Sequence, residues 1–205
     1  MRTKYAILLT SLLLSTQVHA NLLKNGGAEL GDLSGWTVGG LSNPTVDDGG
    51  FDPGISPRTG AYMFRGGIGS YGTLTQKVLL TGMGLGRELT VTFWEQGLDQ
   101  DTPSDDGYVT LTYFSLGGAV LGTQSTDEID SHDGVWSPYR GIFAVPLDAI
   151  SVDYTMHFKR NFGLDLDAFF DDNSLTLTTV PEPSTAWLML AGLGLMGAFW
   201  RRRTR

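Results

Sequence analysis

Residues 89–94 read Leu-Thr-Val-Thr-Phe-Trp, and residues 109–114 repeat the pattern as Val-Thr-Leu-Thr-Tyr-Phe. Apolar and polar residues alternate in both runs, and both are rich in β-branched and aromatic residues. Such alternation places successive side chains on opposite faces of a β-strand, one toward a core and one toward water. The two runs therefore predict two strands of a sheet that buries one of its faces.

The same pattern continues in both directions along the chain. Further strands are predicted at 61–64, 71–80, 119–122, 137–144, 154–159 and 175–179, with Gly, Pro, Asn and Asp turns between them. No stretch between them has a helical period. About eight short strands of this kind are typical of an all-β antiparallel sandwich. Residues 39–60 are Gly-rich and contain three prolines, so we expect a long surface excursion there.

Distinctive segments stand at both ends of this strand-rich region. The first reads Asn21-Leu22-Leu23-Lys24-Asn25-Gly26-Gly27-Ala28-Glu29 and is followed by Trp36, and the last reads Phe170-Asp171-Asp172-Asn173-Ser174-Leu175. Together they resemble the opening and closing segments of galactose-binding-like jelly rolls, a superfamily that includes many carbohydrate-binding modules. The resemblance covers most of residues 21–180 and is loose in the middle. It implies that the sandwich is a jelly roll.

Glu29, Asp171 and Asp172 are the acidic residues to which this resemblance gives a role. In galactose-binding-like jelly rolls, the acidic residue after the Asn-Gly-Gly turn and an aspartate of the closing strand commonly meet at a calcium ion. The resemblance therefore implies a structural Ca²⁺ site, completed by main-chain oxygens, which suits the preference of calcium for six to eight oxygen ligands. The alternative is that Asp171 and Asp172 begin the last strand and accept turn N–H groups.

The last residues of the chain form three successive parts. These are the motif Val180-Pro181-Glu182-Pro183-Ser184, an uncharged run to Trp200, and the basic end Arg201-Arg202-Arg203-Thr204-Arg205. The two prolines end the preceding domain, because proline lacks the N–H that a helix or strand uses. We expect a transmembrane helix over about 185–200. Its stretch from Ala186 to Trp200 would be only about 22 Å long against about 30 Å of hydrocarbon, with the arginines on the cytoplasmic side.

This tail closely resembles the PEP-CTERM sorting signal of Gram-negative bacteria that make exopolysaccharide. The resemblance implies recognition at residues 181–183 by an inner-membrane exosortase, which is thought to cleave near the Pro-Glu-Pro motif. Glu182 and its flanking prolines would then be recognised elements and not catalytic ones. The alternative is an ordinary single-span tail anchor.

Residues 1–20 have the features of a secretory signal peptide. Arg2 and Lys4 are basic, residues 6–14 form a mostly apolar h-region, and Val18-His19-Ala20 has the small-x-small pattern of a signal peptidase site. We therefore expect three parts: a signal peptide helix at 1–20, one β-sandwich domain at 21–179, and a sorting signal with its transmembrane helix at 180–205. We also expect export across the inner membrane, with delivery to the cell surface or the extracellular matrix.

The composition of the domain restricts its partners. Residues 21–180 contain 8 Lys and Arg against 21 Asp and Glu, a net charge of −13, compared with −8 for the whole chain. This balance argues against nucleic acid as a partner, since phosphate binding needs clustered Lys and Arg. The sequence has no cysteine, which excludes disulfides, thiol nucleophiles and zinc-thiolate sites.

Aromatic residues are the candidates for contact with sugars, because their flat faces can stack on sugar rings. Core packing is the alternative role, and we expect it for Trp36 and Trp94. Tyr71 and Tyr108 adjoin glycine-rich turns, and Trp136 stands in a Gly- and Pro-containing segment. These three residues are therefore the predicted ligand-binding residues.

Catalysis has little support in the sequence. His132 and His157 are the histidines of the mature domain, and no Gly-x-Ser-x-Gly nucleophile elbow is present. We therefore expect an exported, non-catalytic protein that associates with exopolysaccharide. A structural or adhesive matrix protein that binds other proteins is the alternative, and a secreted esterase or glycosidase is the least favoured.

Overall fold

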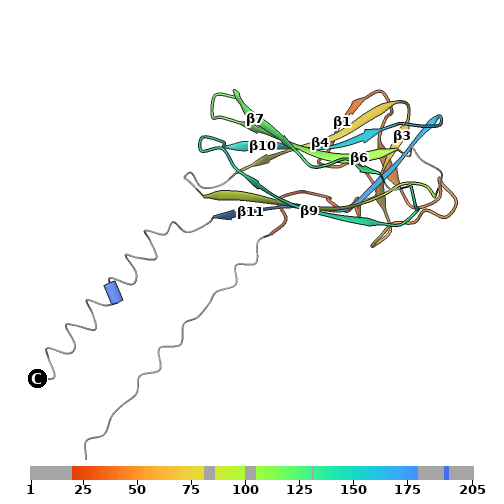
Figure 1. The fold of residues 1–205 in the computed structure, drawn as a ribbon, viewed down its shortest axis with the longest axis horizontal. Helices are drawn as coiled ribbons and strands as arrows, with labels where there is room; N and C mark the ends of the chain where they lie inside the picture. Colours follow the sequence, from red (N-terminus) through yellow and green to blue (C-terminus); the bar gives the residue numbers. More distant parts are fainter. Residues whose placement is uncertain (1–19, 81–85, 100–104, 131, 180–191, 194–205) are drawn as a thin grey trace, which may run out of the picture.

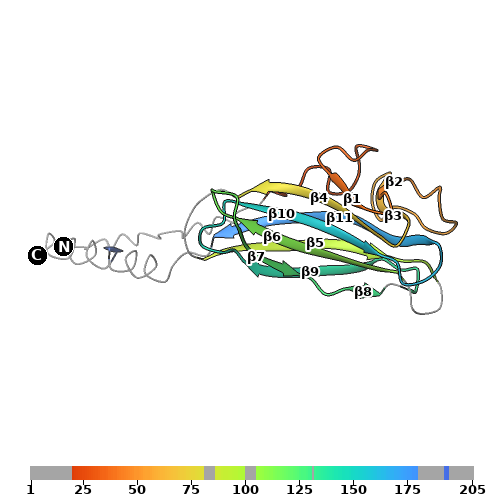
Figure 2. The same ribbon diagram turned by 90° about the horizontal axis from the view of Figure 1, so that it is seen from above.

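The structure, a computed structural model, describes residues 20–80, 86–99, 105–130, 132–179 and 192–193. Two antiparallel sheets, one of six strands and one of five, lie face to face in it (Figure 1). Figure 2 shows the same strands from above, with the segment that contains β2 and β3 at one end of the domain. The predicted all-β sandwich is confirmed.

The six-stranded sheet has the order β1-β4-β10-β6-β7, and β8 pairs with one end of β6. Its strands are β1 (Thr37–Gly40), β4 (Tyr71–Leu79), β6 (Asp106–Phe114), β7 (Val120–Ser125), β8 (Ile129–Asp130) and β10 (Ser151–Lys159). All of β10 pairs with β4 on one side and with β6 on the other. The side chains of these three strands therefore have a fixed register across the sheet.

The five-stranded sheet has the order β2-β3-β11-β5-β9. Its strands are β2 (Thr45–Asp47), β3 (Met63–Ile68), β5 (Arg87–Gln96), β9 (Ser137–Ala144) and β11 (Asp165–Thr179). The register of β11 against β5 shifts between Asp171 and Ser174, and Asp172 has a φ of 51° there. One extra residue on one strand is a β-bulge, which turns the side chains beside it away from the regular alternation.

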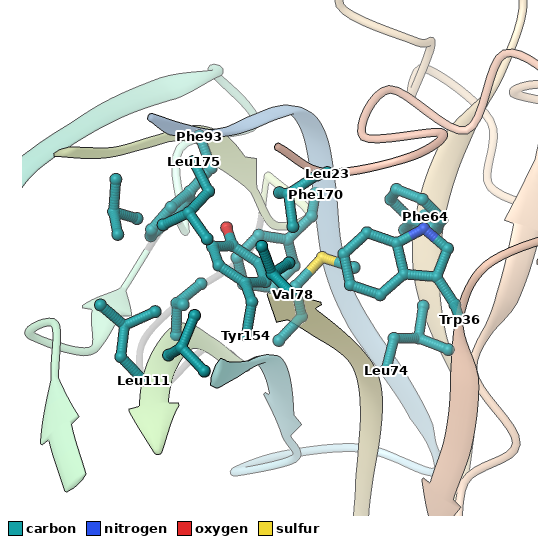
Figure 3. Close-up of a cluster of buried hydrophobic side chains, with 14 of the residues drawn as sticks. Leu23, Trp36, Phe64, Leu74, Val78, Phe93, Leu111, Tyr154, Phe170 and Leu175 are labelled. Carbon is teal, nitrogen blue, oxygen red and sulfur yellow. The ribbon is translucent and has the colours of Figure 1, made fainter. Parts of the chain in front are cut away.

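The core lies between the sheets and follows the alternation of the sequence. Leu89, Val91 and Phe93 of β5 all point inward and are fully buried. Phe93 packs against Phe170 of β11, with 5.2 Å between the ring centroids. Figure 3 shows Phe93, Phe170 and Leu175 next to residues of the opposite sheet such as Tyr154 and Leu111. The two sheets therefore share one hydrophobic core.

Trp36 closes one side of this core and is 8% exposed, as predicted. Its ring lies edge-on to Phe64 at 5.3 Å and to Tyr154 at 6.0 Å between centroids. The hydroxyl of the buried Tyr154 donates to Asn173 Oδ1 at 2.9 Å, which satisfies a polar group that would otherwise be costly to bury. The segment that follows Asn21 is therefore part of the sandwich.

Trp94 was predicted to be internal, and this prediction is wrong. Trp94 follows the inward-facing Phe93 on β5, so the alternation places it on the outer face, where it is half-buried. The physical reason was visible in the 89–94 run itself, because neighbouring residues of a strand cannot both face the core.

Every predicted strand overlaps an observed one, but most of the boundaries differ, as for the predicted strand at 61–64, which is observed as β3 at Met63–Ile68. Residues 137–144 form β9 as predicted, whereas β1, β2 and β8 were not predicted, and β11 begins at Asp165 instead of Leu175. β1 and β2 are short and lie at sheet edges, and the first half of β11 contains aspartates, which have low β-propensity. Pairing with neighbouring strands forms these segments, which their local sequence does not predict.

The predicted signal peptide lies outside the described residues except for Ala20, and the predicted sorting signal lies outside them except for residues 192–193. Within the part of the chain that the structure describes, no helix is both long and apolar enough to cross a membrane. The helices expected at the two ends stay predictions.

Candidate functional site

A row of three aromatic rings crosses the outer face of the six-stranded sheet. Tyr71 of β4, His157 of β10 and Tyr108 of β6 alternate with buried residues of their strands, so they point away from the core. The Tyr108 and His157 rings stack with centroids 4.4 Å apart and 2° between their planes. The Tyr71 ring centroid lies 5.9 Å from the imidazole. The fold thus brings together two of the predicted ligand-binding residues, Tyr71 and Tyr108, with His157 between them.

Hydrogen bonds hold the imidazole of His157 in a fixed orientation. Its Nδ1 lies 2.5 Å from the Tyr71 hydroxyl, and its Nε2 lies 2.8 Å from Thr110 Oγ1. Burial lowers the pKa of His157 to about 4, so the ring is neutral at pH 7. In a neutral ring one nitrogen donates and the other accepts, so one of the two hydroxyls donates to the imidazole and the other accepts from it. Burial also raises the pKa of Tyr71 to about 12, and Tyr108 contributes to that rise, so its hydroxyl stays protonated at pH 7.

Hydroxyl groups and ion pairs surround this row on the same face. Threonine hydroxyls bond to each other in pairs, Thr75 with Thr155 at 3.0 Å and Thr112 with Thr123 at 3.1 Å. Two lysines pair with carboxylates near opposite ends of the strands, Lys159 with Glu128 and Asp106, and Lys77 with Asp153. The face therefore presents rings and hydroxyls in its middle and locally paired charges at its ends.

The outer face of the five-stranded sheet differs, because the segment between β2 and β3 packs over part of it. Ile55 of this segment contacts Met63 of β3 and Phe169 of β11, and all three side chains are buried. Since these residues point away from the main core, they form a second, smaller hydrophobic cluster on the outside of the sheet.

Trp136, the third predicted ligand-binding residue, packs against this smaller cluster. Its indole N–H donates to the Ser56 carbonyl at 3.2 Å, which fixes the ring against the covering segment. Trp136 therefore belongs to the five-stranded side of the sandwich, whereas Tyr71 and Tyr108 belong to the six-stranded side. The three predicted residues do not form one site.

Arg58 connects the covering segment to the sheet beneath it. Its guanidinium lies over the Trp94 ring, with Cζ 3.7 Å from the ring centroid, and its Nη1 donates to Asp172 Oδ2. A guanidinium above an indole gains cation–π attraction, and its planar edge remains free to bond a carboxylate. Trp94 is thus covered by Arg58.

The acidic residues of the predicted calcium site all contact residues 58–62. Glu29 accepts from the main-chain N–H groups of Ala61 and Tyr62, and buried Asp171 accepts from those of Arg58 and Thr59. Gly60 has a φ of +65°, and a Cβ there would collide with the Glu29 carboxylate. Glycine therefore lets this turn approach Glu29 closely.

The three carboxylates already accept hydrogen bonds from residues 58–62. Burial raises the pKa of Asp171 to about 6, in opposition to its main-chain hydrogen bonds, which lower it. Among the described residues, no group of three or more His, Asp or Glu side chains is arranged to hold a metal ion. As arranged here, N–H groups and Arg58 occupy the carboxylate oxygens that a calcium ion would need. Calcium at this place stays a prediction.

Sequence reasoning missed the role of Arg58 and did not link His157 to the tyrosines. His157 stands in register opposite Tyr108 and Thr73, a fact that follows only from strand pairing. The alternation with Met156 and Phe158 was the available signal, because it placed His157 on an outer face. The sorting motif at Val180–Ser184 lies outside the described residues.

Comparison with protein families matches residues 179–203 to the PEP-CTERM protein-sorting motif. Comparison with curated proteins gives no match. Among solved structures, the carbohydrate-binding module TmCBM61 in complex with beta-1,4-galactotriose is 21% identical with a TM-score of 0.54, covering 78% of this chain and 99% of that one. The CBM22-1 xylan-binding domain of Paenibacillus barcinonensis Xyn10C is 13% identical with a TM-score of 0.53, covering 80% and 97%.

The enzymatically active domain of the bacteriophage CBA120 tailspike protein 4 is also similar, at 14% identity and a TM-score of 0.58. The match covers 77% of this chain but only 21% of the tailspike chain. Likeness at these identities concerns the fold. The chain thus carries a PEP-CTERM protein-sorting motif behind a jelly-roll β-sandwich like those of carbohydrate-binding modules.

Proposed function

We propose that this chain is an exported, non-catalytic protein that binds polysaccharide through the outer face of its six-stranded sheet. The row formed by Tyr71, His157 and Tyr108 carries the proposal. Aromatic rings supply apolar contact for the C–H faces of sugar rings, and fixed polar groups beside them set orientation. Hydrogen bonds already hold the row in place, so little side-chain entropy is lost when a ligand binds.

The surroundings of the row support a neutral ligand. The threonine hydroxyls can donate and accept hydrogen bonds, as sugar hydroxyls do. The lysines of the face are paired with carboxylates, and the net charge of the domain is strongly negative, which disfavours polyanions. Neutral polysaccharide of the extracellular matrix is therefore the class of ligand that we assign.

The sorting motif supplies the cellular part of the proposal. A PEP-CTERM motif at 179–203 supports export and handling by an exosortase at the inner membrane, after removal of a signal peptide by signal peptidase. The product would be a surface or matrix protein that associates with exopolysaccharide.

A non-catalytic role agrees with the state of the histidines. Both ring nitrogens of His157 are bonded to Tyr71 and Thr110, and its lowered pKa makes the protonated form scarce at neutral pH. His132 is exposed, with Nδ1 3.2 Å from Asp130 Oδ1. A general base needs a free nitrogen within reach of its substrate.

The test is a glycan array followed by calorimetric titration, with the full chain purified in mild detergent. We expect saturable binding to a neutral polysaccharide, and we expect Tyr71→Ala and Tyr108→Ala each to weaken it about tenfold or more, which is about 1.4 kcal/mol. Phe51→Ala is the matched control, because Phe51 is an exposed aromatic residue that stacks on Arg65 and lies away from the row.

Two outcomes would overturn the proposal. If the tyrosine variants bind glycans as well as the unaltered protein does, the row is not the binding face. If no glycan binds and a matrix protein does, the adhesive alternative replaces it.

Calcium enters this proposal only as a structural ion at Glu29, Asp171 and Asp172. Because Arg58 now supplies the positive charge beside Asp172, the carboxylates fit a calcium ion only if Arg58 and some N–H contacts give way.

A further inference from the structure

A hollow lies on the side of the sandwich opposite the Tyr71 row, between the segment that covers the five-stranded sheet and the residues just before β9. It has a volume of about 400 Å³ and is lined by Gly54, Ser56, Pro57, Arg58, Gln96 and Trp136, among others. A volume in the low hundreds of Å³ is typical of sites for small ligands. Another hollow shares the lining residues Gly54 and Gly134 with this one, so the two hollows are adjacent.

Gln96 lines this hollow and carries a buried polar atom without a partner among the described residues. Gln96 is only 3% exposed, and its Nε2 donates to the Gly134 carbonyl at 2.6 Å. A carbonyl oxygen can only accept a hydrogen bond, so this contact fixes the orientation of the amide. Oε1 therefore lies on the side of the amide away from the Gly134 carbonyl. Within the described residues, Oε1 has no hydrogen-bond partner. A buried acceptor without a donor is unfavourable, so a ligand that donates to Oε1 after a small shift of the amide toward the hollow would gain affinity.

The other walls of the hollow are held rigidly. Trp136 is fixed by its bond to Ser56, and Arg58 is fixed between the Trp94 ring and Asp172. Arg58 has more N–H donors than Asp172 accepts, so it can also donate to a ligand oxygen. The hollow thus combines a half-buried indole, an acceptor and a set of donors within one small volume.

This combination indicates a neutral, hydroxylated ring. A sugar hydroxyl can donate to Gln96 Oε1 and accept from Arg58, while the C–H face of the ring contacts Trp136. An anion is disfavoured, because Asp172 pairs with the Arg58 charge and Asp52, Asp99 and Asp133 line the adjoining hollow. A cation is disfavoured as well, because the positively charged guanidinium of Arg58 lines the hollow.

Gln96 and Trp94 share the outer face of β5, whereas the Tyr71 row faces outward from the other sheet, with the core between them. One sugar chain that lies on the row cannot contact Gln96 through the core. We propose that the hollow at Gln96 and Trp136 is a second, independent site for a neutral sugar ring, so that one domain can join two polysaccharide chains. The choice of sugar as its ligand rests on the proposed function of the first face.

The test follows Trp136 directly by indole ¹⁵N–¹H NMR of the full chain, with its signal assigned from Trp136→Phe. The probes are neutral monosaccharides and short neutral oligosaccharides, including xylo- and galacto-oligosaccharides. We expect a saturable shift of the Trp136 signal that persists in Tyr71→Ala and weakens at least tenfold in Gln96→Met. Gln124→Met is the control, because Gln124 is a half-buried amide of β7 that bonds Tyr113.

A second measurement tests the joining of two chains. The unaltered protein should precipitate or gel a neutral polysaccharide that it binds, whereas Tyr71→Ala and Gln96→Met should each bind it without cross-linking. A thermal melt of Gln96→Met shows whether the variant is folded, and a loss of sugar response in a folded variant supports the site.

The outcomes separate this inference from the proposed function. If glycans bind through Tyr71 and never move the Trp136 signal, the second site is wrong and the first face stands. If sugars shift the Trp136 signal and Tyr71→Ala leaves total glycan binding in the titration unchanged, the hollow is the binding site and the row is not. If no sugar binds anywhere, both proposals fail.

Discussion

The outer faces of the two sheets satisfy their side chains in different ways. On the six-stranded sheet, half-buried rings and hydroxyls face outward and bond to each other, as in the contacts of His157 with Tyr71 and Thr110. On the five-stranded sheet, the 48–62 segment covers Met63 and Phe169 and makes a second apolar cluster. The open face is accessible, and His157 at its centre bonds to its neighbours Tyr71 and Thr110. The covered face is apolar beneath its loop, and among the described residues Gln96 Oε1 has no donor. A sandwich can therefore expose one surface for extended ligands and build a pocket on the other.

The largest expected effect tests whether the covered face is a true second core. Phe169→Ala should lower the free energy of unfolding by about 3–5 kcal/mol, as for a core phenylalanine, because its buried contacts with Ile55 and Met63 would be replaced by a cavity. Tyr108→Ala on the open face should cost only about 1 kcal/mol, which is the scale of one ring pair. Urea denaturation followed by circular dichroism measures both. Equal losses in the two variants would contradict the difference between the faces.

The next effect concerns the pH dependence of the covered face. Burial raises the pKa of Asp171 from 3.8 to about 6, so the folded state binds a proton more tightly than the unfolded state. The contribution of Asp171 to stability is therefore present below about pH 4 and is lost as the pH rises toward 6, by on the order of 2 kcal/mol.

Asp171→Asn removes this titration and keeps an oxygen that can accept from Arg58 and Thr59. Stability measured by urea denaturation at a series of pH values should therefore fall less steeply between pH 4 and 6 in the variant. Asp167, whose pKa is also raised to about 6 by burial and by neighbouring aspartates, accounts for the slope that remains. An unchanged slope would show that the Asp171 carboxyl is not buried in the folded state.

The open face should show the opposite pH dependence, with a smaller effect. Burial lowers the pKa of His157 from 6.5 to about 4, so the unfolded state binds its proton more tightly. Stability is then lost as the pH falls from about 6.5 toward 4, by on the order of 1 kcal/mol after screening by solvent. His157→Gln should abolish this loss, which is visible most clearly in an Asp171→Asn background. If His157→Gln steepened the loss instead, the imidazole would be charged in the folded state.

The two faces also differ in how well the sequence predicts them. Alternation over 89–94 and 109–114 predicted the strands and the inward positions, because a half-buried strand is a local pattern. It also contained the correct position of Trp94, which follows Phe93. The Tyr71 row needed strand register, since β4, β10 and β6 are neighbours in space but not in order along the chain.

The covered face depends still more on long-range contacts. Residues 39–60 look like simple coil, yet they include β2 and the Ile55 contact that builds the second cluster. The bulge at Asp172 and the contacts of Arg58 join parts of the chain that are far apart in sequence. No local pattern specifies such contacts, so the hollow at Gln96 could not be predicted from the sequence.

The smallest expected effect decides whether calcium belongs to the covered face. Because the Arg58 side chain bonds Asp172 and its main-chain N–H donates to Asp171, Arg58 competes with any cation for the same oxygens. We expect millimolar calcium to raise the melting temperature of Arg58→Ala more than that of the unaltered protein, since binding to the folded state stabilises in proportion to RT ln(1 + [L]/Kd). Arg140→Ala is the control, because Arg140 is an exposed arginine of β9 outside this cluster. A melt that is indifferent to calcium in all three proteins would mean that Glu29, Asp171 and Asp172 serve the 58–62 turn through their N–H contacts alone.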